Sequence, residues 1–145
     1  MNTFWFLTTS NKPRLRDPTQ VQQIIGRYWF DFDFTVAVED HPDGQHCLGI
    51  QGNGWPAAWL PPPDTSSEEW YPDFDTSGQE EFAAFLAEVA PFLTEALTVQ
   101  AIGTAAGEFP FSACEWRVEP NAATVARMEF TSNAENSAPL VMAFV

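Results

Sequence analysis

The string D-x-D-x-S-G is the part of the sequence that looks most like a metal site. It follows the first ligand positions of a calcium-binding EF-hand loop, and its members are Asp73, Asp75, Ser77 and Gly78. Ala84 occupies the position of the glutamate that closes the coordination shell, so the match is incomplete. Ser77 and Glu80 also have the spacing of a capping box. We favour this second interpretation, in which the acids lead into the start of a helix.

Both histidines, His41 and His46, lie in a short acidic stretch that also contains Cys47. Two imidazoles five residues apart across a turn can approach each other, and nitrogen and sulfur ligands suit zinc. The intervening H-P-D-G sequence predicts a tight turn between two strands, where polar residues are expected without a metal. We therefore predict neither a metal nor a cofactor.

Nucleophilic catalysis would require Cys114 to act with one of the histidines. The alternation of residue types instead places Cys114 on the inner face of a strand, beside Trp116 and Val118. No nucleophile elbow, phosphate-binding loop or zinc-protease motif occurs in the sequence. We predict a protein that is not an enzyme, with Cys47 and Cys114 as buried thiols in a cytoplasmic chain.

The composition is dominated by acidic charge, −14 at pH 7 from 20 acidic and 6 basic residues. Residues 28–116 contain no lysine or arginine, but they contain sixteen of the acidic residues. Such a field repels nucleic acids and anionic membranes and attracts basic partners. The alternative is an acidic surface that only maintains solubility or reflects adaptation to salt.

Residues 52–77 form an irregular, proline-rich stretch, and between residues 64 and 81 seven acidic residues are interleaved with three aromatic ones. Acids steer a protein towards a basic surface, and Trp and Tyr are enriched in interface hot spots. We predict a partner-binding surface that consists of Asp64, Glu68, Glu69, Trp70, Tyr71, Asp73, Phe74, Asp75, Glu80 and Glu81, with Asp31, Asp33 and Glu39 on the wet face of a strand. Alternate strand residues repeat at about 6.6 Å, which is near the phosphate spacing of a nucleic-acid strand.

The predicted function is that of a small acidic binding protein without enzymatic activity. It would act as an inhibitor or adaptor that occupies a basic surface of a protein partner, and a nucleic-acid-binding enzyme is one such partner. Immunity and counter-defence proteins offer an analogy in charge and size alone. The alternative is a small-ligand or metal-binding domain in which residues 52–77 form a lid.

Two helices are predicted from the spacing of apolar residues. The first covers residues 18–29, with Asp17 as N-cap and Pro18 at the first helical position. The second follows the capping box, and Pro91 ends or kinks it. Its apolar stripe is formed by Phe82, Phe85, Leu86 and Val89.

Strands are predicted at residues 3–8, 30–39, 46–51, 97–103, 112–118, 124–131 and 140–145. In the strand at 124–131 we expect Ala126, Met128 and Phe130 to face inward and Arg127 and Glu129 to face outward. The order of elements predicts a single α+β domain with a mostly antiparallel sheet of five to seven strands and two helices on one face. Its first part would be a ferredoxin-like βαββαβ unit, followed by C-terminal strands.

Overall fold

The computed structural model describes residues 4–30, 33–54, 56–61, 78–105, 111–121, 124–131 and 141–144. The elements in these ranges are β1 (Phe4–Ser10), α1 (Pro18–Arg27), β2 (Phe34–Asp40), β3 (His46–Gly52), α2 (Gln79–Val89), the 3-10 helix η1 (Ala90–Phe92), β4 (Leu97–Ala105), β5 (Phe111–Val118), β6 (Ala126–Thr131) and β7 (Val141–Phe144). The strands form one sheet in the order β2-β3-β1-β4-β5-β6-β7, and all neighbours are antiparallel. The predicted α+β class and antiparallel sheet are confirmed. With three strands added beyond β4, the order is not that of a simple four-stranded ferredoxin-like domain.

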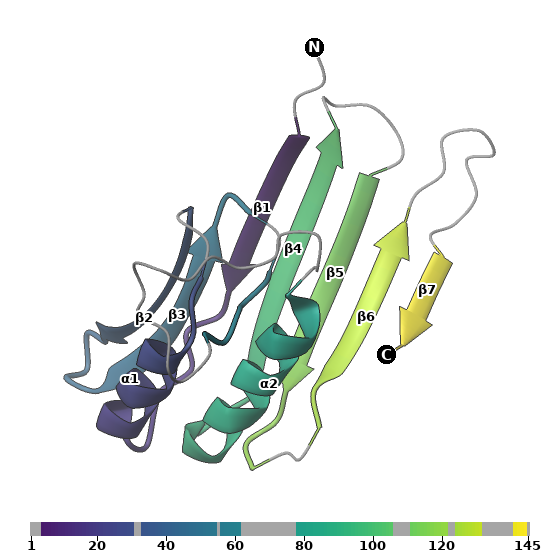
Figure 1. Ribbon diagram of the computed structural model, residues 1–145. Helices are drawn as coiled ribbons and strands as arrows, with labels where there is room; N and C mark the ends of the chain where they lie inside the picture. The colour runs from purple at the N-terminus through teal and green to yellow at the C-terminus, as the bar shows by residue number, and fades with distance from the viewer. Residues whose placement is uncertain are drawn as a thin grey trace.

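Both helices lie on the same face of the sheet, the face towards the viewer in Figure 1. Helix α1 begins as predicted, since Asp17 accepts a hydrogen bond from the Gln20 backbone N–H at 3.2 Å and Pro18 takes the first position. Its buried stripe is Val21, Ile24 and Ile25. Figure 1 also shows that β6 and β7 extend the sheet beyond α2.

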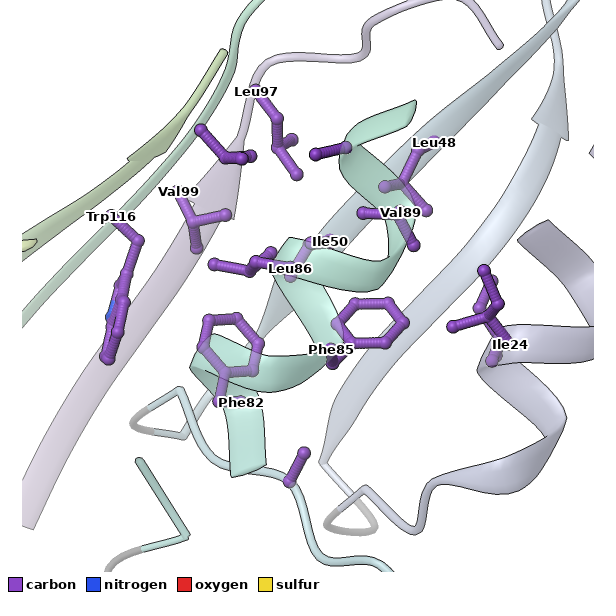
Figure 2. Close-up of a cluster of buried hydrophobic side chains, with 14 of the residues drawn as sticks. Ile24, Leu48, Ile50, Phe82, Phe85, Leu86, Val89, Leu97, Val99 and Trp116 are labelled. Carbon is purple, nitrogen blue, oxygen red and sulfur yellow. The ribbon is translucent and has the colours of Figure 1, made fainter. Parts of the chain in front are cut away.

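Helix α2 supplies the centre of the core. Phe82, Phe85, Leu86 and Val89 are fully buried, and Figure 2 shows them between strand side chains such as Leu48, Val99 and Trp116. Burial of a side chain of this size contributes about 1.5–3 kcal/mol. The aromatic rings meet edge to face, as in the 5.4 Å contact of Phe82 with Trp116.

The start of α2 differs from the predicted capping box. The N-cap is Gly78, with a φ of 66°, and it provides no side-chain cap. A Cβ at this position would lie 2.8 Å from the Ala58 carbonyl oxygen, so the close approach of residues 58 and 59 requires glycine. Ser77 lies outside the described residues.

Two strand predictions were wrong in detail. β2 begins at Phe34, so Asp33 precedes the strand and is not on its wet face. In β6, Arg127 pairs with Trp116 across the sheet and therefore faces the core side, whereas Met128 pairs with Glu115 on the other face. The guanidinium of Arg127 stacks 4.7 Å above the Trp116 ring. Arg127, paired with Glu129, thus lies at the margin of the core, where an apolar residue was predicted.

Candidate partner-binding surface

The structure describes four of the thirteen residues predicted to bind a partner: Asp33, Glu39, Glu80 and Glu81. The other predicted site residues lie outside the described residues; they are Asp31, Asp64, Glu68, Glu69, Trp70, Tyr71, Asp73, Phe74 and Asp75. Most of these residues belong to residues 62–77, which we call the acidic segment. The described part of the chain shows where this segment joins the fold.

Asp33, Glu80 and Glu81 lie at the starts of two neighbouring elements, and we call this region the acidic end. Asp33 immediately precedes β2, and the two glutamates form the first turn of α2. The starts of these elements touch, since the rings of Phe34 and Phe82 are 6.1 Å apart. Carboxylates at a helix N-terminus also interact favourably with the helix dipole.

The described residues that flank the acidic segment are adjacent at this same end. The Ala58 N–H donates to the Gly78 carbonyl at 3.1 Å, and Trp29 and Trp59 exchange two backbone hydrogen bonds. The indole of Trp59 meets that of Trp29 edge-on at 5.3 Å. Residues 62–77 therefore connect two neighbouring points of the acidic end. Next to them lies Leu60, a large apolar side chain that is 51% exposed.

Glu39 does not belong to the acidic end. It lies near the other end of β2, and its carboxylate accepts from Lys12 Nζ at 3.1 Å. The side chain lies over Gly49, where an added Cβ would be only 1.7 Å from Glu39 Oε2. The predicted acidic row on β2 is therefore not formed by these two residues: Asp33 precedes the strand, and Glu39 is paired with a cation.

Basic side chains are placed away from the acidic end or are paired. Lys12, Arg14 and Arg16 follow β1, and Arg117 lies near the end of β5; these strands are parallel, so all four lie at the opposite end. Ion pairs join Lys12–Glu39, Arg14–Asp43, Arg27–Glu88, Arg117–Glu119 and Arg127–Glu129. Among the described residues, none of these ion pairs involves Asp33, Glu80 or Glu81.

The two histidines of the hairpin lie near different carboxylates and form no metal cluster among the described residues. His41 Nδ1 lies 2.8 Å from Asp43, whereas His46 Nδ1 lies 3.1 Å from Asp40. Among the described residues there is no group of three or more His, Cys, Asp or Glu side chains that could hold a metal ion. The Asp43 carboxylate accepts from the Gln45 backbone N–H and from Arg14, and these bonds lower its pKa to about 2.

Both cysteines are free and buried, as predicted. Burial raises the pKa of the Cys114 thiol to about 11 and also raises the pKa of Cys47. Neither thiol has the lowered pKa that activates a cysteine nucleophile.

Sequence reasoning missed an apolar surface on the face of the sheet opposite the helices. Leu7 and Ile102 lie there and are 42% and 43% exposed. A signal was present in residues 3–8, where apolar residues occupy both faces of the predicted strand.

No protein-family model matches the chain, and no curated protein or solved structure matches it either. Within the part of the chain that the structure describes, no helix combines the length and apolar character needed to cross a membrane.

Proposed function

We propose that the protein is a non-enzymatic binding protein that attaches to a basic surface of a protein partner through its acidic end. The observation that carries this proposal is the separation of charge. Asp33, Glu80 and Glu81 form no ion pair among the described residues, whereas Lys12, Arg14, Arg16 and Arg117 lie at the opposite end. Association of such a surface with a cationic site is accelerated by long-range attraction.

The arrangement also supplies an apolar contact for affinity. Leu60 is exposed and directly follows Trp59, whose backbone pairs with that of Trp29. By sequence, residues 62–77 add five further carboxylates, together with Trp70, Tyr71 and Phe74. Apolar anchors within a charged rim are typical of protein interfaces.

The partner class that fits best is a nucleic-acid-binding protein whose cationic site the acidic end blocks. A site that holds phosphates presents clustered Lys and Arg, and a protein with a net charge of −14 competes for them. The protein would then act as an inhibitor in the cytoplasm, where its two thiols stay reduced.

A finer assignment of the fold is part of the same proposal. Strand β1 lies between β3 and β4, β3 lies between β1 and β2, and a helix follows β1 and β3. This order supports a ferredoxin-like βαββαβ unit that is extended by the meander of β5, β6 and β7. The acidic end is the edge of that unit at which β2 and α2 begin.

Affinity capture with matched charge reversals tests the proposal. The tagged wild-type protein is expected to retain a basic protein from lysate at low salt, identified by mass spectrometry. Glu80→Lys/Glu81→Lys should lose it. The control Asp40→Lys/Glu95→Lys changes the net charge equally but alters residues away from the acidic end, so it should retain the same protein. Failure of the wild-type protein to retain any basic protein, or equal capture by both variants, would overturn the proposal.

A further inference from the structure

The face of the sheet opposite the helices, here called the open face, carries a continuous apolar row. The strand register aligns Leu7 with Ile102, and Ile102 with Ala113. Met128 of β6 lies on the same face, since it pairs with Glu115 of β5. The row therefore crosses three adjacent strands, β1, β4 and β5.

This row is exposed, although an antiparallel sheet with helices on one side normally presents polar residues on the other. Leu7 and Ile102 are two of the three large apolar side chains that are clearly exposed among the described residues. Around them is a shallow groove of about 410 Å³, lined by Leu7, Thr9, Ile102, Ala113, Glu115 and Met128. Contiguous exposed apolar surface of this kind marks an interaction site.

The charge on the open face is nearly balanced, in contrast to the whole chain. Glu39 is neutralised by Lys12, and Glu115 accepts from Gln100 Nε2 at 2.8 Å while Arg117 lies two residues further along β5. Arg117 is itself paired with Glu119, so among the described charged side chains on this face two acids are paired with two bases and Glu115 is a third acid, held by Gln100. A second copy with a net charge of −14 meets little repulsion there, whereas it would be repelled at the acidic end.

The size of the face suits a stable dimer. Seven strands at a spacing of about 4.8 Å, each with about seven residues at about 3.3 Å, cover about 800 Å². A standard protein interface buries about 800 Å² on each partner, and homodimer interfaces are the more apolar ones.

We propose that the open face binds a second copy of this chain, so that two sheets pack face to face with the helices outside. Nearly neutral charge favours a copy of the same chain over a cationic partner, because a cationic partner gains little from this face. A twofold arrangement is the usual geometry for such a surface. The acidic ends remain free in the dimer, so this inference and the proposed function succeed or fail separately.

Sedimentation velocity and light scattering test the dimer, with one exposed apolar residue as target and another as control. Ile102→Glu places a carboxylate in the apolar row, and Leu60→Glu places one on the acidic end. The wild-type protein and Leu60→Glu are expected to be dimers at micromolar concentration, and Ile102→Glu a monomer with an unchanged circular dichroism spectrum. Added salt should preserve or tighten the dimer, since it screens the repulsion between two acidic chains.

The outcomes separate the alternatives. A wild-type monomer throughout the micromolar range overturns the proposal and leaves the face to a different occupant. A dimer that persists in Ile102→Glu, or one that Leu60→Glu breaks instead, shows that another surface joins the copies. Should Ile102→Glu fail to fold, Leu7→Ser serves as the second variant, and it should weaken the dimer at least about tenfold, or about 1.4 kcal/mol.

Discussion

At the scale of single residues, Glu88 joins the two helices. It accepts hydrogen bonds from the Tyr28 hydroxyl and from the Arg27 guanidinium, both at the end of α1. Burial alone would raise the pKa of Glu88, but the bonds from Tyr28 and Arg27 lower it. The ring of Tyr28 also meets Phe85 edge-on at 5.4 Å. The Glu88 carboxylate of α2 thus connects this helix to the C-terminal end of α1.

Removal of the Tyr28 hydroxyl should therefore destabilise the protein. We expect Tyr28→Phe to lower the free energy of unfolding by about 1–2 kcal/mol, since a hydrogen bond to a charged group is lost while the ring remains. Urea unfolding measures this change. In the Glu88→Gln background the same substitution should cost clearly less, and purely additive effects would contradict the link.

Asp43 makes the hairpin between β2 and β3 sensitive to acid. Its folded-state pKa of about 2 lies below the unfolded value of about 3.9, so its contribution to stability is present above about pH 4 and is lost as the pH falls through about 2. Asp43→Asn keeps an acceptor for the Gln45 N–H but removes the charge. Urea midpoints measured between about pH 5 and about pH 2 should therefore fall less steeply in Asp43→Asn. Parallel curves for the two proteins would refute this assignment.

At the scale of elements, local sequence signals placed most of the fold. The cap at Asp17 and Pro18 located α1, and Phe82, Phe85 and Val89 located the buried stripe of α2. Tertiary packing decided the rest. Gly78 became the N-cap because residues 58 and 59, distant in sequence, press against it, and no local pattern reports such a contact.

The facing of β6 was wrong for a similar reason. The strand alternates cleanly, with Arg127 and Glu129 on one face and Ala126 and Met128 on the other, but alternation alone does not show which face meets the helices. Pairing with β5 put Arg127 over Trp116, where the aromatic ring and Glu129 compensate its burial. The acidic residues of the candidate site were predictable as a group, but the pairing of Glu39 with Lys12, 27 positions away, was not.

Two glycines of β3 should respond differently to alanine. A Cβ at Gly52 would lie 2.4 Å from the Asp33 carbonyl oxygen, so the backbone must move. We expect Gly52→Ala to lower the free energy of unfolding by about 1–3 kcal/mol. At Gly49 the obstacle is the flexible end of Glu39, and loss of its exposed pair with Lys12 costs only about 0–1 kcal/mol. Thermal melts of the two variants measure the difference. A larger loss of stability in Gly49→Ala than in Gly52→Ala would contradict the prediction.

At the scale of the whole molecule, the chain combines two surfaces that differ in charge and in apolar character. The open face is apolar and nearly neutral, whereas the three described carboxylates of the acidic end form no ion pair. Electrostatic attraction at the acidic end weakens as salt is added, because the screening length shortens from about 14 Å to about 6 Å between about 50 mM and about 300 mM salt. Apolar packing on the open face does not weaken in this way.

The central claim is that the acidic end binds a basic protein partner, and the association rate with the captured partner tests it most directly. Surface plasmon resonance at low and moderate salt should show that Glu80→Lys/Glu81→Lys slows association roughly tenfold or more, whereas Asp40→Lys/Glu95→Lys stays close to the wild-type rate. Added salt should slow the wild-type protein towards the rate of the first variant. Equal rates for the two variants, or a wild-type rate that salt does not change, would contradict the claim.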